Sequence, residues 1–327
     1  MTVLPGDDAA ALAAAAQRLA DGGLVAFPTE TVYGLGARAD DDRAVAAIFA
    51  AKGRPADHPL IVHVAGAEQA AVFAAGLPPA ALRLVRAFWP GPLTVIVPRA
   101  QGVAAAAAGG QSSIGLRCPS HPVALALLRE AAKRGVAGVA GPSANRFGRI
   151  SPTSAAHVAS EFGPELWVLD GGNCAVGIES SIVDVSRGTP VLLRPGVLTR
   201  GQIEAALGEP LHASDVQSPR APGTLAAHYA PSARLRLWPA AALAAALHEP
   251  ATWPVGLAVY SRRVGAAPAG VPWHRMPDDP AAAAHELFAV LRQFDDAGAA
   301  EIWVEQPPDD PAWEGVLDRL RRAAAAA

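Results

Sequence analysis

The chain has 327 residues, of which 51% are hydrophobic and 17% charged, and its net charge at pH 7 is −3. This near-neutral balance lacks the basic surplus of a general nucleic-acid binder, so we expect no stable binding to nucleic acid. The sequence contains no strongly apolar run of about 18 residues and no secretory signal at MTVLPGDDAA, which predicts a cytoplasmic protein without membrane association. Cys118 and Cys174 are the only cysteines, and no Cys/His spacing typical of zinc occurs, so we expect no protein-bound metal.

The first two thirds of the chain alternate predicted helices with predicted strands. An alanine-rich helix ends at Asp21-Gly22-Gly23. After it we expect strands at 24–27, 60–64, 93–97, 114–117, 136–140, 166–169, 182–185 and 191–193, with helices at 43–51, 82–88 and 122–134 between them and a loop with a turn at 28–36. This alternation predicts a twisted mixed α/β sheet with a ligand cavity.

The composition changes near residue 208. Residues 208–233 are rich in Pro, Ser and Gly and show no apolar periodicity, which predicts a linker, although it contains His228-Tyr229. Beyond it, strands at 234–238, 255–260 and 301–304 alternate with helices at 240–247, 281–297 and 313–324. We therefore predict a catalytic domain at 1–207, a linker or lid at 208–233, and a small Rossmann-like domain with a parallel sheet at 234–327.

Polar residues gather at or just beyond the ends of the predicted strands. The stretch from Phe27 to His63 is the densest of these regions, and it holds Lys52, one of only two lysines in a chain that otherwise uses arginine. The candidate cations are Lys52, Arg54, Arg117 and Arg194, and the candidate hydroxyls are Thr31, Ser113, Ser143, Ser151, Thr153 and Ser180. Each alone is as typical of a surface ion pair or a turn as of a site, so the prediction depends on their combination.

The chain lacks the motifs of the common phosphate-handling and hydrolytic enzymes. There is no GxxxxGK[ST], no kinase glycine-rich loop and no GxSxG nucleophile elbow. Cations and hydroxyls without a nucleophile suit the binding of polyanionic substrates and the stabilisation of charge at phosphorus.

Nine motifs, in chain order, carry a resemblance to a known family. They are PTETVYGLG, KGRP, HPL, WPGPLT, LRCPSHP, PSAN, SPT, ESSIVD and LRPG, and a later HYAP follows them. The chain closely resembles the YrdC-like threonylcarbamoyl-AMP synthase family in its long, two-domain form. The resemblance implies a nucleotidyltransferase that makes L-threonylcarbamoyladenylate from L-threonine, bicarbonate and ATP with Mg²⁺, releasing pyrophosphate. Its product serves proteins that modify adenosine 37 of tRNA.

The resemblance also implies roles for individual residues. Thr31, His63, Arg117, Ser143 and Ser180 would bind L-threonine, with Arg117 as a planar fork for its carboxylate. Lys52, Arg54, His58, Ser113, Asn145, Ser151, Thr153 and Arg194 would hold ATP, with Lys52 and Arg54 offsetting charge during catalysis, and Tyr229 would close over the nucleotide as part of a lid. Whether His63 moves a proton or only orients the ligand stays open.

The chain departs from the family pattern in two places. The linker residues Ala221 to Ala227 lack the serine, methionine and basic pair expected there, and Ser181 replaces an expected threonine. Two other functions remain as alternatives, namely an RNA-binding module and a carbamoyl transferase that uses carbamoyl phosphate.

Overall fold

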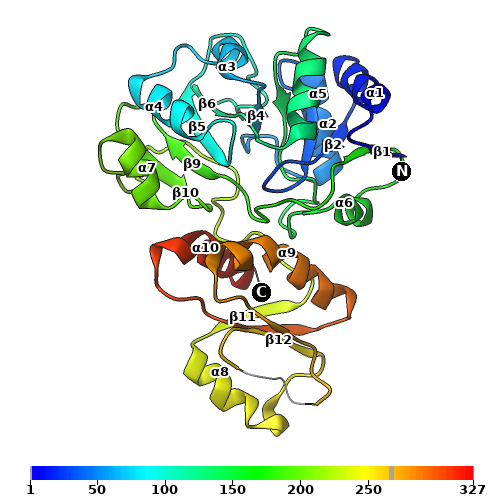
Figure 1. Cartoon of the computed structure of the whole chain (residues 1–327), viewed down its shortest axis with the longest axis vertical. Helices are drawn as coiled ribbons and strands as arrows, with labels where there is room; N and C mark the ends of the chain where they lie inside the picture. Colours follow the sequence, from blue (N-terminus) through cyan, green and yellow to red (C-terminus); the bar gives the residue numbers. More distant parts are fainter. Residues whose placement is uncertain (1, 265–268, 327) are drawn as a thin grey trace. The chain divides into compact units, whose positions relative to one another are not determined.

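The computed structural model describes residues 2–264 and 269–326, which form two compact units (Figure 1). The first unit comprises the chain up to Phe147 together with Ser151–Thr224, and the second comprises Gly148–Ile150 together with the chain from Leu225 onward. Residues 208–224 of the predicted linker therefore lie in the first unit, and residues 225–233 lie in the second. None of the helices in the described ranges is long and apolar enough to cross a bilayer.

The first unit is built on a ten-stranded mixed sheet with the order β1-β8-β2-β3-β7-β4-β6-β5-β9-β10. Its strands are β1 (Thr2–Pro5), β2 (Val25–Phe27), β3 (Gly34–Arg38), β4 (Ile61–His63), β5 (Leu93–Pro98), β6 (Ser113–Arg117), β7 (Val139–Ala140), β8 (Trp167–Asp170), β9 (Ser181–Asp184) and β10 (Val191–Arg194). Its helices are α1 (Ala9–Ala20), α2 (Asp42–Lys52), α3 (Ala67–Phe73), α4 (Pro79–Phe88), α5 (Pro122–Ala132), α6 (Ala155–Glu161) and α7 (Arg200–Leu207). The predicted mixed α/β sheet is confirmed.

The two faces of this sheet are covered differently. One face carries the main apolar core, into which α2, α3, α4, α6 and α7 contribute buried residues. The other face is covered by α1 and α5, which pack side by side over Phe27, Val139 and Leu169 (Figure 1). Farther along that second face, β4, β6, β5 and β9 present a mixture of polar and apolar side chains. This part of the second face positions the candidate site.

The predicted loop at 28–36 is wrong in its last three residues, because β3 begins at Gly34 and pairs antiparallel with β2. The two glycines make room for the ring of Phe27. A Cβ on Gly34 would lie 3.1 Å from the Phe27 ring, and one on Gly36 would lie 2.9 Å from it. These glycines therefore serve the packing of a strand pair, and not the turn that we predicted.

The second unit contains a four-stranded, all-parallel sheet with the order β11-β14-β12-β13. Its strands are β11 (Arg234–Trp238), β12 (Leu257–Ser261), β13 (Trp273–Arg275) and β14 (Glu301–Glu305), and its helices are α8 (Ala240–Leu247), α9 (Pro280–Asp296) and α10 (Glu314–Ala324). Two short 3₁₀ helices lie at Pro250–Thr252 and Pro311–Trp313. The parallel Rossmann-like sheet predicted for this region is confirmed.

Most predicted elements have a counterpart within a few residues of the expected bounds. The structure adds helices and strands that the sequence analysis did not predict, namely β1, β3, α3, α6, α7 and β13. The three helices that were not predicted, α3, α6 and α7, are seven or eight residues long. Helices this short span about two turns, so their apolar residues repeat too few times to form a clear pattern.

Candidate active site

The candidate site lies on the second face of the first unit's sheet, beyond α5. Because side chains alternate along a strand, Ile61 and His63 of β4 point to one face while Val62 points into the main core. Strand β6 pairs in parallel with β4 and places Arg117 directly beside His63. Two residues far apart in the chain are therefore fixed as neighbours by strand register.

Arg117 is buried, and its Nη2 donates a hydrogen bond of 2.8 Å to Thr31 Oγ1. Thr31 Oγ1 lies 2.9 Å from Thr29 Oγ1, and Thr29 in turn donates its hydroxyl to the carbonyl of Val32 at 2.6 Å. Thr29 Oγ1 also accepts the backbone N–H groups of Thr31 and Val32, each at 3.2 Å, so the Thr29 hydroxyl is fixed by the surrounding backbone. Thr31 Oγ1 accepts from Arg117 and retains a second lone pair for a ligand.

The same guanidinium is paired with a buried carboxylate that was not among the predicted site residues. Glu30 Oε1 lies 2.8 Å from Arg117 Nη2, and Glu30 Oε2 accepts the backbone N–H of Ser120 at 3.1 Å. Glu30 stands between Thr29 and Thr31 in the PTETVYGLG motif. Its place beside a candidate threonine was the signal that could have identified it.

His63 is held as a neutral imidazole. Burial, and then the positive charge of Arg117, lower its pKa from 6.5 to about 3. The edge of its ring meets Phe27 with centroids 5.6 Å apart, and a Cβ on Gly141 would lie 2.9 Å from its Nδ1. Tight packing and a neighbouring cation therefore keep this side chain uncharged near neutral pH.

Ser180 and Arg194 form a second polar group on this face. Ser180 Oγ lies 2.8 Å from Thr94 Oγ1, and Arg194 donates to the Ser180 carbonyl through Nε at 3.0 Å and Nη2 at 2.9 Å. Nη1 of Arg194 donates to the carbonyl of Pro222 at 2.9 Å. Arg194 thus ties the loop before β9 to the segment that follows α7.

Lys52 ends α2 and reaches the backbone of the PSAN motif. Its Nζ donates to the Ser143 carbonyl at 2.6 Å and to the Asn145 carbonyl. Burial, and then the nearby charge of Arg54, hold the pKa of Lys52 well below its ordinary value. An anion placed here would raise that pKa again, because it would offset the cost of desolvating the ammonium.

Arg54 and His58 both lie against Phe147. The guanidinium carbon of Arg54 is 5.7 Å from the Phe147 ring centroid, and the His58 ring is 5.4 Å from the same centroid. Arg54 Nη2 also donates to the Pro59 carbonyl at 2.9 Å. His58 is half-buried, and burial followed by the charge of Arg54 lowers its pKa.

The remaining predicted residues have partners of their own. Asn145 Nδ2 donates to the Arg146 carbonyl at 2.8 Å, the Ser151 hydroxyl donates to the buried carboxylate of Glu179, and Thr153 Oγ1 lies 3.2 Å from His157 Nδ1. The structure thus brings the predicted residues of the first unit together as linked groups. Their roles in ligand binding stay predictions.

The segment 215–222 lies over the part of the face that carries Ser113. Ala221 packs against Ile61, Ile96 and Ile182. The hollow between Ser113, Thr94 and this segment has a volume of about 10 Å³, which is close to that needed by a single water molecule. A nucleotide therefore does not fit beside Ser113 while the segment occupies this position.

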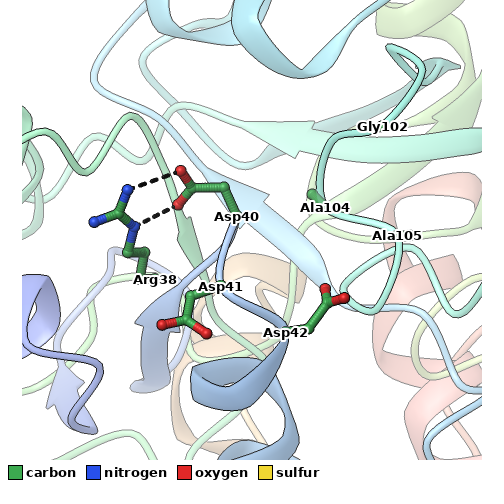
Figure 2. Close-up of a pocket in the computed structure, with 7 residues that line it drawn as sticks. All are labelled: Arg38, Asp40, Asp41, Asp42, Gly102, Ala104 and Ala105. Atoms are coloured by element: carbon green, nitrogen blue, oxygen red, sulfur yellow. Dashed lines mark hydrogen bonds and ion pairs between the residues drawn. The ribbon is translucent and has the colours of Figure 1, made fainter.

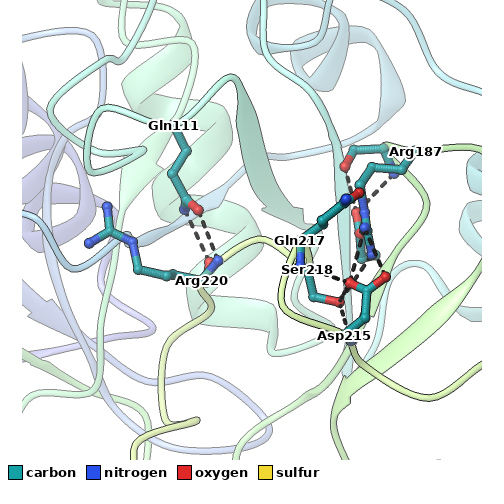
Figure 3. Close-up of polar contacts among 8 residues, drawn as sticks. Gln111, Arg187, Asp215, Gln217, Ser218 and Arg220 are labelled. Carbon is teal, nitrogen blue, oxygen red and sulfur yellow. Dashed lines mark hydrogen bonds and ion pairs between the residues drawn. The ribbon is translucent and has the colours of Figure 1, made fainter.

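Polar contacts fasten the segment at two points (Figure 3). Arg220 exchanges two hydrogen bonds with the Gln111 side chain, of 2.8 Å at its backbone N–H and 3.1 Å at its carbonyl, and pairs with Asp57 at 2.8 Å. Arg187 pairs with Asp215 at 3.1 Å and donates to Ser218 at 3.0 Å. The exposed side chains at both points make these contacts individually weak.

Tyr229 belongs to the second unit, where its side chain is buried. Its ring lies 5.7 Å from that of Phe288 and 4.2 Å from that of His228, and the Arg319 guanidinium carbon is 5.2 Å from its centroid. Tyr229 also has a positive φ of 60°. Its predicted role in a lid stays a prediction.

A larger pocket, of about 410 Å³, is lined by Arg38, Asp40, Asp41, Asp42, Gly102, Ala104 and Ala105 (Figure 2). Arg38 is paired with Asp40 at 2.7 Å, and Asp41 caps α2. None of the predicted site residues lines this pocket. Its net negative charge is unsuited to a polyphosphate, so we place the site at the smaller hollow beside Ser113.

These features define a mixed-sheet α/β domain with several buried cations and hydroxyls. Residues 17–196 match the Sua5/YciO/YrdC family model, described as telomere recombination, and residues 198–325 match the model described as threonylcarbamoyl-AMP synthase, C-terminal domain. The chain belongs to the Sua5/YciO/YrdC family, in the form that carries this C-terminal domain.

Curated relatives and a solved structure agree with this assignment. The chain is 47% identical over 227 residues to the threonylcarbamoyl-AMP synthase of Pyrococcus abyssi, covering 68% of this chain and 66% of that one. It is 43% identical over 233 residues to that of Bacillus subtilis, covering 69% and 66%. A crystal structure of P. abyssi Sua5 complexed with L-threonine matches with a TM-score of 0.87 and 38% identity, covering 96% and 94%. The sequence matches thus span about two thirds of the curated relatives.

Proposed function

We propose that this chain is a threonylcarbamoyl-AMP synthase, a nucleotidyltransferase that converts L-threonine, bicarbonate and ATP into L-threonylcarbamoyladenylate and pyrophosphate. The observation that carries the proposal is the buried group of Thr31, His63 and Arg117 on the second face of the sheet. The names of the relatives from P. abyssi and B. subtilis, and the L-threonine in the P. abyssi complex, support the same activity.

In this proposal, Arg117 binds the carboxylate of L-threonine. Its Nη2 already contacts Thr31 and Glu30, whereas its Nε has no hydrogen-bond partner within the described ranges. The substrate carboxylate therefore binds through Nε or Nη1, or displaces a contact of Nη2, because not all donors of the guanidinium are available. Ser143 and Ser180 complete the threonine subsite with their hydroxyls.

The nucleotide subsite is proposed to use eight residues, namely Lys52, Arg54, His58, Ser113, Asn145, Ser151, Thr153 and Arg194. The carbamate oxygen attacks the α-phosphorus as pyrophosphate leaves, and Lys52 and Arg54 offset the negative charge that develops. Both side chains are buried, which strengthens their interaction with a phosphate relative to water.

Mg²⁺ belongs to the proposal as an ion that arrives on the phosphates of ATP. The described residues contain no group of three or more His, Cys, Asp or Glu side chains that could hold a metal ion. Phosphate oxygens and water are ordinary ligands of Mg²⁺, so such a protein cage is not required. The ion would supply further charge neutralisation at the phosphates.

Entry of ATP requires the segment 215–222 to move, because it fills the space beside Ser113. Its return over the bound substrates would exclude water from the carbamate and from the mixed anhydride. We propose that Tyr229 takes part in this closure. The adenylate would then pass to tRNA-modifying proteins in the cytoplasm, where a fluorescent fusion of the chain should be found.

Pyrophosphate release in reactions that omit one substrate at a time tests this function. We expect release only when L-threonine, bicarbonate and ATP are all present. Release with carbamoyl phosphate in place of bicarbonate would instead identify a carbamoyl transferase. Salt-sensitive retention of RNA without any release would identify an RNA-binding module.

A further inference from the structure

The proposed reaction needs a proton acceptor, and the present inference rests on that proposed function. The amine of L-threonine is an ammonium at neutral pH and has no lone pair for attack on carbon. One proton must leave before a carbamate can form. A group in the threonine subsite that receives this proton would speed the reaction near neutral pH.

Four titratable groups near the subsite are poorly suited to receive it. Burial and the charge of Arg117 lower the pKa of His63 to about 3, and burial lowers that of His121. Burial raises the pKa of Cys118 to about 11 and that of Cys174 to about 12, so both remain protonated thiols. His63 is thus a weaker base than an ordinary carboxylate, and the Nδ1 lone pair of His121 already accepts the Val123 N–H at 3.2 Å. The two thiols are not ionised and cannot act as bases.

Glu30 is the carboxylate that directly contacts Arg117. Its side chain is 9% exposed, and the Oε1 atom has no hydrogen-bond partner among the described residues, although it lies 2.8 Å from Arg117 Nη2 as an ion pair. Oε2 is fixed by the backbone N–H of Ser120. A buried carboxylate oxygen without a hydrogen bond is costly, and a donor on the substrate would satisfy it.

Glu30 Oε1 and the neighbouring Thr31 Oγ1 are both hydrogen-bond acceptors. Arg117 Nη2 contacts both Glu30 Oε1 and Thr31 Oγ1 at 2.8 Å, so the two oxygens flank one nitrogen. Thr31 Oγ1 accepts from Arg117 and retains a second lone pair that can accept from a ligand. Two acceptors next to a guanidinium suit a zwitterion, with the carboxylate at Arg117 and the amine at Thr31 and Glu30.

We propose that Glu30 Oε1 accepts the proton that the amine of L-threonine must lose. An N–H bond of the ammonium breaks and an O–H bond forms at Oε1. The freed lone pair then forms the N–C bond to bicarbonate, whose hydroxyl leaves as water with a second amine hydrogen, and Glu30 releases its proton to solvent after turnover.

Charge favours this transfer once the substrate is bound. Before it, the buried site holds two cations, Arg117 and the ammonium, and two anions, Glu30 and the substrate carboxylate. After it, one ion pair remains, between Arg117 and the substrate carboxylate. Removing a cation and an anion from surroundings of low dielectric constant lowers the desolvation cost.

The test compares Glu30→Gln with the parent protein in pyrophosphate release at saturating substrates, from about pH 6.5 to about pH 9. The amide keeps the size of the side chain and removes the acceptor. We expect the variant to lose on the order of 10²-fold in rate at pH 7. We also expect its residual rate to rise about tenfold per pH unit, because only amine already neutral in solution can react, whereas the parent profile is shallower.

Two further variants separate this role from a structural one. Glu30→Asp keeps a carboxylate and should retain the shallow profile at a reduced rate. Glu305→Gln removes a carboxylate that is likewise buried, but in the second unit, and should retain both rate and profile. Thermal unfolding of each variant checks its fold, and if Glu30→Gln does not fold, the profile of Glu30→Asp decides.

The outcomes are distinct. A Glu30→Gln variant whose profile parallels that of the parent, or a Glu30→Asp variant with the steep profile, overturns the role of Glu30 and leaves the proposed synthase activity standing. A parent protein whose pyrophosphate release ignores L-threonine overturns the proposed function itself.

Discussion

His63 makes the folded first unit sensitive to acid, and replacing it should remove that sensitivity. The pKa of His63 is lowered from 6.5 to about 3, by burial and by Arg117. A depressed folded-state pKa contributes stability that is complete above the unfolded pKa and is lost as the pH falls toward the folded one. The affected window therefore runs from about pH 6.5 down to about pH 3.

The magnitude follows from this shift. At pH 5 the unfolded chain carries a proton on His63 almost completely, while the folded protein carries almost none. At 1.36 kcal/mol per pKa unit, the contribution of His63 to the unfolding free energy falls by about 2 kcal/mol between pH 8 and pH 5. The glutamine in His63→Gln does not titrate. The difference in unfolding free energy between the parent and this variant should therefore be smaller at pH 5 than at pH 8 by about the same amount.

Urea titrations at about pH 8 and about pH 5 measure the unfolding free energy of each unit. Hydrogen exchange in peptides that cover β4 and β11 distinguishes the first unit from the second. The exposed His248, at the C-terminal end of α8, provides the control substitution His248→Gln, which should leave the pH dependence of the first unit unchanged. Equal pH dependence of the parent and of His63→Gln would refute the neutral, buried state of this imidazole.

Three further predictions concern ligand binding. Arg220→Ala loosens the segment over Ser113, and since exposed ion pairs contribute about 0.2–1 kcal/mol, ATP affinity measured by calorimetry should rise by up to about fivefold; an unchanged affinity would contradict the closed position. Because the pKa of Lys52 is depressed, ATP binding should take up a proton, seen as a dependence of the binding enthalpy on buffer, and Lys52→Met should abolish that dependence. Gly141→Ala places a Cβ 2.9 Å from His63 Nδ1 and should weaken L-threonine binding, with overpacking costs of about 1–3 kcal/mol, whereas Gly163→Ala meets no neighbour and should bind as the parent does.

The sequence was sufficient to predict the class of fold and the all-parallel second sheet, because long apolar runs and turn residues mark strands and helices locally. It could not predict the strand order. Strand β4 pairs with β6 and β7, which are distant in the chain, and this pairing brings His63 beside Arg117. Register of that kind depends on the whole sheet and leaves no local pattern.

The candidate residues were recognised by type and by motif, but their partners were not. Lys52 was identified as a cation, yet its hydrogen bonds to the Ser143 and Asn145 carbonyls join residues about 90 positions apart. The carboxylate of Glu30 was visible within its motif, but its pairing with Arg117 requires the fold. Partners of buried charges are set by tertiary structure, which is why their protonation states could not be predicted from the sequence.

The most direct test of the proposed activity follows the carbon atom of bicarbonate. The chain is incubated with L-threonine, ATP, Mg²⁺ and ¹³C-labelled bicarbonate, and the products are analysed by mass spectrometry, in parallel with Lys52→Ala and Arg117→Ala. We predict L-threonylcarbamoyladenylate with one heavy carbon from the parent and a strongly reduced amount from both variants. An adenylate without the heavy carbon, no adenylate from the folded parent, or undiminished product from both variants would contradict the account.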